Sequence, residues 1–275
     1  MASKAPVVAP GVFDPMIAKI LAAEGFPALY AGGSAISVMM YGRPDLGLTS
    51  LSERVDAVAR ITEASDLPLM VDADTGFGGP LTLRLCVRQF EQAGAAGLHI
   101  EDEADKSTHD FGSNAAPVDV MTDRIKIALE ARTDPDFLLF ARCNTLRSHG
   151  LEETVARAHA YLDAGADGLF VLGMTPDEVE TVAREFPGVP QIYNMSVRGD
   201  GPKLTVARLG ELGYGLVIVP NLFTLAVMRT VQEVGRELLA EGSIAHLIDR
   251  IARPDEWEDV SGFTAAEAFQ ADHRH

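Results

Sequence analysis

The sequence predicts an α/β protein of the (β/α)8, or TIM-type, barrel class. Eight short apolar runs recur along the 275 residues, and stretches with a 3.6-residue apolar period lie between them. Several junctions carry glycine, as in Ala93 to Leu98 and Ala164 to Leu169, which is typical of a capped helix end that leads into a buried strand. This alternation indicates parallel strands covered by helices. No Gly-x-Gly-x-x-Gly motif follows the first run, so a barrel is favoured over an open nucleotide-binding sheet.

In chain order, the predicted strands are Pro6–Ala9, Ala28–Ala31, Leu69–Asp72, Gly97–Glu101, Phe137–Arg142, Gly168–Leu172, Gln191–Asn194 and Gly215–Pro220. The predicted helices include Leu51–Ala64, Leu81–Gln92, Val120–Ala131, Leu151–Leu162, Pro176–Glu185 and Leu204–Leu212. The segment 222–252 is predominantly helical and extends past the eighth strand. We therefore expect one barrel domain over residues 1–275, with a C-terminal helical extension that covers the barrel or packs on a partner subunit.

Composition limits the class of protein. The chain is 47% hydrophobic with a mean hydropathy of +0.09, which suits a compact domain. No apolar stretch reaches the roughly 18 to 20 residues of a membrane span, and Met1 to Pro6 lacks the apolar segment of a signal peptide, so we expect a cytoplasmic protein. Cys86 and Cys143 are the only cysteines and are expected to be reduced.

The net charge argues against polyanionic partners. The chain has 23 Lys and Arg against 40 Asp and Glu, a formal charge of −17, which repels nucleic acid and anionic membranes. An anionic substrate must therefore be attracted by local positive groups and a bound metal.

Acidic side chains follow the third predicted strand. Asp72 and Asp74 stand where Pro68–Val71 gives way to a Gly-rich loop, at the end of the barrel where such folds keep their chemistry. Two carboxylates at this spacing suit a hard cation, with Mg²⁺ preferred and Mn²⁺ as the alternative. The competing interpretation is that Asp74 caps the next helix while Asp72 pairs with a nearby Arg or Lys.

Other polar residues belong to the same mouth if the barrel is correct. They are Tyr30 to Ser34, Glu101, Asp102, Arg142, Asn144 and Asn194. Acidic groups that face a guanidinium and amides predict a site where a cation and donors stabilise negative charge on a substrate oxygen.

Several motifs resemble the isocitrate lyase/phosphoenolpyruvate mutase superfamily, and the similarity runs from about Val8 to Arg236. The matching segments are Tyr30-Ala31-Gly32-Gly33-Ser34, Gly42-Arg43-Pro44-Asp45-Leu46-Gly47, Asp72-Ala73-Asp74-Thr75-Gly76-Phe77-Gly78, His99-Ile100-Glu101-Asp102, Ala141-Arg142 and Asn194-Met195.

The resemblance implies a set of roles. Asp72 would bind Mg²⁺ directly, while Asp45, Asp74 and Glu101 would hold its waters. Gly32, Gly33 and Ser34 would present donors to a 2-oxo or 2-hydroxy acid, with Asn194 and Thr108 as further substrate contacts, and Arg142 would grip a carboxylate. From the residues alone, Asp45 could instead be a turn residue after Pro44, and Glu101 and Arg142 could be a buried pair.

The polar loop Asp102 to Pro117 is long for a compact barrel, and a functional lid or a merely solvated loop both remain open. The resemblance implies a gate. Lyases of isocitrate and methylisocitrate carry Lys-Lys/Arg-Cys-Gly-His in this loop, whereas this chain reads Lys106-Ser107-Thr108-His109. Since a Thr is too weak an acid to replace that Cys, the proton donor would be His109, Tyr30, Lys106 or water. Cys143 is disfavoured as a displaced nucleophile because strand alternation turns it away from Arg142.

The sixth and fifth strand ends also differ from those lyases. Leu172-Gly173 stands where they have a Glu, and Arg142-Cys143-Asn144 stands where they have Arg-Thr-Asp. These changes predict an apolar distal side that suits a small or alkyl-substituted acid.

The predicted function is a Mg²⁺-dependent lyase that cleaves a C–C bond in a small 2-hydroxy or 2-oxo acid such as a substituted malate. Alternatives are oxaloacetate decarboxylation or hydrolysis, phosphonate P–C chemistry, and a non-catalytic metabolite-binding barrel. The resemblance further implies a homodimer or homotetramer with exchanged helices.

Overall fold

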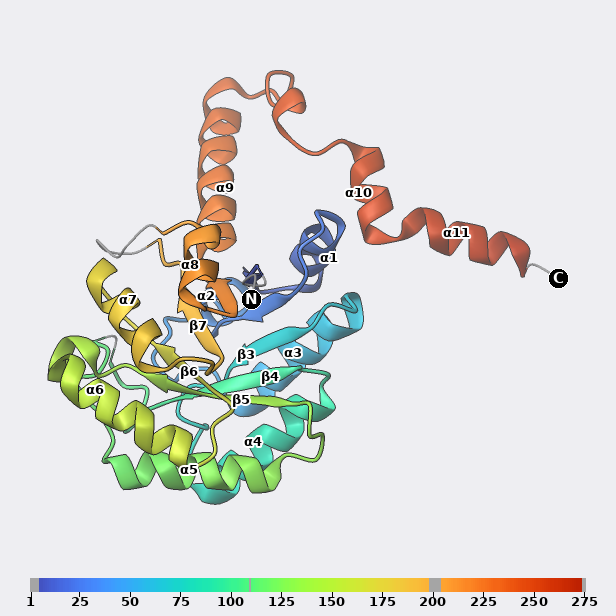
Figure 1. Cartoon of the computed structure of the whole chain (residues 1–275). Coiled ribbons are helices and arrows are strands. Elements are labelled where there is room, and N and C mark those ends of the chain that lie inside the picture. Colours follow the sequence, from blue (N-terminus) through green and yellow to red (C-terminus); the bar gives the residue numbers. More distant parts are fainter. Residues whose placement is uncertain (1–4, 109, 198–203, 274–275) are drawn as a thin grey trace.

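The computed structural model describes residues 5–108, 110–197 and 204–273. Eight parallel strands form a closed barrel in the order β1 to β8, and helices surround it (Figure 1). The predicted (β/α)8 class is therefore confirmed. The strands are β1 Val7–Val12, β2 Leu29–Ala31, β3 Leu69–Asp72, β4 Gly97–Glu101, β5 Leu138–Cys143, β6 Gly168–Val171, β7 Gln191–Asn194 and β8 Leu216–Val219.

The first strand is longer than its sequence suggests. The sequence predicts a strand that ends at Ala9, but β1 continues through Pro10 and Gly11 to Val12. Gly11 pairs with Tyr30 of β2, and a Cβ at Gly11 would lie 1.9 Å from the carbonyl oxygen of Pro220. Glycine is therefore needed for a close strand contact here, although Pro-Gly in a sequence is typical of a turn.

The helices that cover the barrel are α1 Pro15–Ala23, α2 Gly33–Tyr41, α3 Leu51–Ala64, α4 Pro80–Gln92, α5 Val118–Ala131, α6 Leu146–Asp163, α7 Pro176–Glu185 and α8 Val206–Leu212. Helix α3 has the predicted bounds because Ser50 and Glu53 form a reciprocal capping box at its start. Helix α6 is interrupted at Gly150, where φ is 83°, and the predicted helix begins at the next residue.

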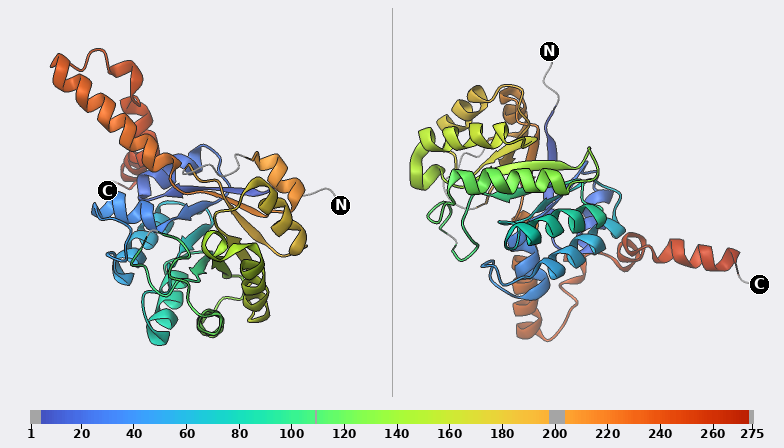
Figure 2. Two further views of the ribbon diagram at one scale, coloured as in Figure 1. Left: turned by 90° about the vertical axis from the view of Figure 1, so that its left-hand side faces the viewer. Right: turned by 90° about the horizontal axis from the view of Figure 1, so that it is seen from below.

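The C-terminal segment forms an arm. Helix α9 (Leu222–Glu241) ends where Gly242 adopts the left-handed conformation, so the predicted helical stretch to Ala252 is divided. Helices α10 (Pro254–Ser261) and α11 (Phe263–Asp272) follow. Helix α9 projects from the barrel and α11 lies well away from it (Figures 1 and 2). Within the described part of the chain, no helix is long and apolar enough to cross a membrane.

Candidate active site

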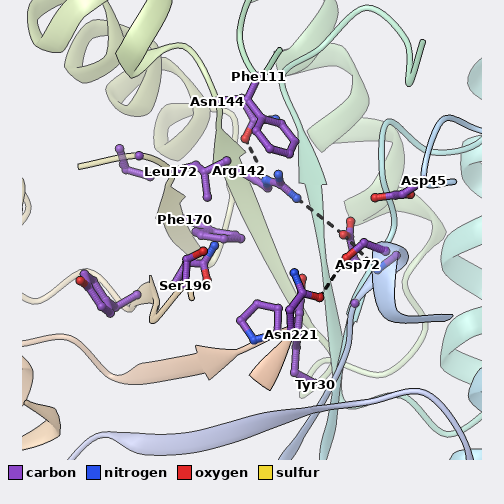
Figure 3. A pocket seen from close by; sticks show the side chains of 18 of the residues that line it. Tyr30, Asp45, Asp72, Phe111, Arg142, Asn144, Phe170, Leu172, Ser196 and Asn221 are labelled. Carbon is purple, nitrogen blue, oxygen red and sulfur yellow. Dashed lines mark hydrogen bonds and ion pairs between the residues drawn. The ribbon is translucent and has the colours of Figure 1, made fainter. Parts of the chain in front are cut away.

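A cavity of about 390 Å³ opens at the carboxyl ends of the strands (Figure 3). Parallel strands all end at this mouth, so loops far apart in sequence meet there. Of the residues predicted for the site, the following line the cavity: Tyr30, Gly32, Gly33, Ser34, Asp45, Asp72, Lys106, Arg142 and Asn194.

The loop after β3 fixes the position of two carboxylates. The Asp72 side chain accepts a hydrogen bond of 3.0 Å from the backbone N–H of Asp74, which closes an Asx turn. Asp74 and Phe77 both have positive φ, at 47° and 62°. A positive φ is uncommon outside glycine and especially rare for an aromatic residue such as Phe77. Backbone of this kind is typical of functional loops. The N-cap of α4 is Gly79, so the interpretation of Asp74 as that helix's cap is wrong.

The four predicted metal-binding carboxylates cluster around buried cations. The Nζ atom of Lys106 lies 3.0 Å from Asp74, 3.3 Å from Glu101 and 3.9 Å from Asp45. Arg54 of α3 lies 3.7 Å from Asp74. Asp45, Asp72, Asp74, Glu101, Lys106 and Arg54 are all buried. Four carboxylates and three cations, counting Arg142, leave one formal negative charge uncompensated.

A divalent cation fits this donor set. In residues 5–108, 110–197 and 204–273, no three acidic, His or Cys side chains converge into a ready-made metal cage. However, the Oδ1 atom of Asp74 is buried and takes no hydrogen bond from any described residue, even though Lys106 Nζ is 3.0 Å away. The ion pair is thus close but poorly directed, and the oxygen-rich, negatively charged donor set is the kind that Mg²⁺ prefers.

The surroundings shift the pKa values of two carboxyl groups in the site in opposite directions. Burial raises the pKa of Glu101 to about 7, against the opposing pull of Arg142 and Lys106. Burial alone would also raise the pKa of Asp72, but surrounding cations, including Arg142 and Lys106, outweigh it and hold that pKa below its ordinary value. Asp72 therefore remains an anion that faces the cavity.

Arg142, at the end of β5, is held rigidly. Its Nε donates to Asn144 Oδ1 at 2.8 Å, and its Nη1 lies 3.3 Å from Glu101 and 3.6 Å from Asp72. The rings of Phe111 and Phe170 lie on either side, with centroids 5.3 and 5.2 Å from the guanidinium carbon (Figure 3). A guanidinium fixed in this way is suited to bind a carboxylate. The Glu101–Arg142 pair considered from sequence is present.

Tyr30 rests on a buried histidine. Its hydroxyl lies 3.0 Å from Nε2 of His99, and the two rings are stacked. Burial lowers the pKa of His99 to about 3, so the imidazole is neutral. Burial, reinforced by Asp72, raises the pKa of Tyr30. The hydroxyl therefore stays protonated, beside the neutral imidazole.

The start of α2 is already partly engaged. The N–H of Gly33 donates to Asp72 at 3.3 Å, and a Cβ at Gly33 would lie 2.8 Å from Arg54 Nη1, so a larger residue would have to displace the buried Arg54 guanidinium. The Ser34 hydroxyl donates to Asn221 at 3.2 Å. Across the cavity, the buried Oδ1 of Asn194 has no hydrogen-bond partner among the described residues and can accept from a ligand.

The end of the cavity that faces Leu172 is mixed in character. Leu172 lies at the opposite end from Asp45 (Figure 3), and Met174 and Val197 add apolar lining to the cavity. Arg147 also lines the cavity, and its side chain lies against Gly173, where a Cβ would be 3.3 Å from the Arg147 Cγ. The apolar distal side predicted from Leu172 is therefore accompanied by a cation that was not predicted from the sequence.

Comparison with known proteins decides the family. A sequence model described as phosphoenolpyruvate phosphomutase matches residues 1–239. The chain belongs to this family. The superfamily prediction is therefore confirmed. The 2,3-dimethylmalate lyase of Eubacterium barkeri is 32% identical over 265 residues, which cover 95% of this chain and 91% of the relative. A crystal structure of a 2,3-dimethylmalate lyase superposes with a TM-score of 0.90 at 30% identity, and the match covers 99% of this chain and 95% of the other.

Two further members show the range of the phosphoenolpyruvate mutase family. The 2-methylisocitrate lyase of Vibrio cholerae is 34% identical over 254 residues, 90% of this chain and 82% of the relative. A phosphonopyruvate hydrolase solved with oxalate and Mg²⁺ matches with a TM-score of 0.87 at 28% identity, covering 98% and 94% of the two chains.

The loop that distinguishes this family member is partly structured. Glu103 and Ala115 form an antiparallel bridge, so the loop is not merely solvated. Lys106 and Phe111 line the cavity, whereas Thr108 does not and its hydroxyl accepts from the N–H of Asp110. The structure thus separates Thr108 from the other predicted substrate contacts. His109 lies outside the described residues.

Several residues of the site were missed from sequence. Arg54, Phe111, Phe170 and Asn221 belong to it, and His99 was noted without a role. Asn144, predicted as an amide at the mouth, lines the cavity. A signal existed for Arg54, because it shares the buried stripe of α3 with Ala57, Val58 and Ile61. A charged residue on such a stripe requires a buried partner.

Proposed function

We propose that the protein is a Mg²⁺-dependent carbon–carbon lyase that cleaves a small, alkyl-substituted malate into a 2-oxo acid and a second carboxylic acid. The observation that carries this proposal is the position of Leu172 opposite the carboxylate cluster and Arg142. The charged end suits the carboxylate and oxygen substituents of the substrate, while the Leu172 side chain suits an alkyl group.

The metal would be held by the carboxylate cluster, with Asp72 as the direct ligand and Asp45, Asp74 and Glu101 around its waters; Mn²⁺ is an acceptable substitute. When bound, a divalent cation stabilises the negative charge that develops on substrate oxygens. The family supports this assignment, since the related phosphonopyruvate hydrolase was solved with Mg²⁺ and oxalate.

The remaining chemistry requires positioning and proton transfer. In a malate-type cleavage the 2-hydroxyl loses its proton, the C2–C3 bond breaks, its electron pair passes to the carboxylate on C3, and C3 then gains a proton. Arg142 is fixed to bind that carboxylate as it becomes more negative. Tyr30, Tyr193 and Lys106 are titratable proton-bearing side chains among the described residues that line the cavity. We assign proton transfer to Tyr30, with Lys106, His109 and water as the other candidates.

A panel of acids tests the substrate class. We expect pyruvate from 2,3-dimethylmalate, and negligible cleavage of isocitrate and methylisocitrate, because Leu172-Gly173 stands where the lyases of those acids have a Glu and the loop Lys106-Ser107-Thr108-His109 lacks their Cys. Robust methylisocitrate cleavage would contradict the proposed substrate class.

A second candidate is hydrolysis or decarboxylation of oxaloacetate. It is favoured by one observation: Thr108, at the loop position nearest to the missing Cys, does not line the cavity, and these reactions need less elaborate acid chemistry. Oxaloacetate belongs in the same panel, with oxalate and pyruvate as the respective products. Turnover of oxaloacetate alone would select this candidate.

We further propose that the arm packs on a second copy of the chain. Apolar side chains remain exposed along its helices, among them Val231, Leu239, Ile244, Trp257 and Phe269. Helix α9 follows β8 directly in the chain. Helix α10 lies beside α1, where the Lys19 side chain donates a hydrogen bond of 3.1 Å to the carbonyl of Ser261. An apolar surface this extensive is unusual for a monomer, and an identical arm supplies a matching surface by two-fold symmetry.

A further inference from the structure

Lys106 occupies an unusual place for a loop lysine. Its ammonium group lies between three carboxylates, at 3.0 Å from Asp74, 3.3 Å from Glu101 and 3.9 Å from Asp45. Only 8% of the residue is exposed. Lysine is rarely buried to this extent without partners, so these carboxylates hold it in place.

The ammonium belongs to a loop that is built like a short hairpin. The N–H of Ala104 donates to the carbonyl of Asn114 at 2.7 Å, and Arg124 of α5 donates to the carbonyl of Glu103. Lys106 stands beyond these anchors and packs against Gly47 of the loop that carries Asp45. The side chain therefore connects the segment 102–117 to the carboxylate cluster.

The ammonium satisfies the cluster incompletely. Asp74 Oδ1 is 3.0 Å from Lys106 Nζ, yet within the described residues this buried oxygen takes no hydrogen bond. With every carboxyl counted as ionised, one formal negative charge also remains in the cluster. The carboxylates are thus arranged for a cation that contacts them from a different direction or carries more charge.

We propose that Lys106 is a tethered cation that takes the place of the divalent metal and its water shell, and that metal binding displaces it. The inference rests on the proposed metal site and adds an exchange to it. One ammonium leaves as one divalent cation enters, and the loop 102–117 loses its buried ionic anchor at the same time. Metal binding and loosening of this loop are then a single equilibrium.

The first test measures affinity for the metal alone. Mn²⁺ binding to the full-length protein is measured by calorimetry or electron paramagnetic resonance for the parent chain, Lys106→Met and Lys106→Gln. Removal of the competing ammonium should tighten Mn²⁺ binding at least tenfold in both variants. Lys126→Met is the matched control, since Lys126 is exposed on α5 and pairs only with Asp123 in the described chain; its affinity should stay within twofold of the parent.

The second test uses the parent protein, so it does not depend on a variant that folds. Hydrogen–deuterium exchange of peptides from 102–117 should become faster when Mg²⁺ is added without substrate, while exchange in α5 stays unchanged. Slower or unchanged exchange in the loop would overturn the proposal.

The outcomes of these tests distinguish a failure of the proposed exchange from a failure of the proposed metal-dependent function. Equal or weaker Mn²⁺ binding by the folded Lys106 variants would overturn the exchange and leave the metal-dependent lyase intact, because Lys106 would then assist the metal. If neither the parent protein nor any variant binds Mn²⁺ or Mg²⁺, both the exchange and the metal-dependent function are wrong.

Discussion

At the scale of single residues, polar side chains of the site are held in buried hydrogen-bonded pairs. Tyr30 is paired with His99 at 3.0 Å, and Arg142 is held by Asn144 at 2.8 Å. Groups fixed before the substrate arrives need little reorganisation during the reaction. Each pair also means that a substitution affects stability as well as turnover.

Tyr30→Phe tests the hydroxyl. The substitution keeps the ring against His99 but removes the proton carrier, so kcat should fall by about 10²- to 10⁴-fold with a smaller change in KM. The free energy of unfolding should decrease by about 1–3 kcal/mol because His99 loses its partner. Tyr41→Phe is the control, since the Tyr41 hydroxyl donates to the carbonyl of Glu53 and Tyr41 is not among the cavity residues. A kcat within threefold of the parent would exclude Tyr30 from proton transfer.

Asp72→Asn tests the proposed direct metal ligand. Asparagine retains an oxygen that can accept from the backbone N–H of Gly33 or Asp74 but removes the charge, so the protein should fold while turnover is lost. Asp72→Ala should destabilise the fold as well, by about 1–3 kcal/mol for each backbone donor left unpaired. Urea unfolding and steady-state kinetics distinguish the two effects. Substantial turnover by Asp72→Asn would rule out this ligand; exposed Asp56→Asn serves as the control.

At the scale of elements, the strands and the amphipathic helices were predictable because each has a simple apolar period. The bounds of α3 and α7 were predicted to the residue, since both begin with a capping box. The full length of strand β1 and the presence of helix α2 were harder to predict from the sequence. Gly11 lies close to the Pro220 backbone and Gly33 close to the Arg54 side chain, and single-sequence patterns cannot distinguish such a glycine from a turn.

The loop between β4 and α5 explains why a thiol cannot simply be restored. Thr108→Cys should not produce isocitrate or methylisocitrate cleavage, because residue 108 is not among the cavity residues and a misplacement of about 1 Å can cost on the order of a hundredfold in rate. The variant is assayed for glyoxylate release from isocitrate and pyruvate release from methylisocitrate. Cleavage at a rate comparable to that of the natural substrate would show that the loop brings residue 108 into the site.

At the scale of the whole molecule, the barrel brings together residues that the sequence separates. Asp72, Asp74, Glu101 and Arg142 were predictable because strand ends converge, whereas Asp45 and the roles of all five came from the superfamily resemblance. The involvement of Arg54 and Phe111 was not predicted, because it depends on how α3 and the long loop pack over the mouth. The position of Lys106 among the carboxylates likewise follows from tertiary packing.

The arm provides a spectroscopic test of assembly. Trp257 is the only tryptophan and is 60% exposed in the single chain. If the arm packs on a second copy, acrylamide should quench Trp257 fluorescence weakly, and light scattering should give a mass at least twice 29.4 kDa. Trp257→Glu should shift the equilibrium toward the monomer, whereas Leu81→Glu, at an exposed position on α4, should not. A monomeric mass with strongly quenched fluorescence would contradict the proposed pairing.

The central claim is metal-dependent cleavage of a substituted malate. Its most direct test is to measure pyruvate and propionate formed from 2,3-dimethylmalate by protein treated with EDTA, before and after Mg²⁺ is restored. The account predicts no product in EDTA and equal amounts of the two acids with Mg²⁺, with the same circular dichroism spectrum throughout. Full turnover in excess EDTA, or no product from any acid of the panel with Mg²⁺ present, would contradict it.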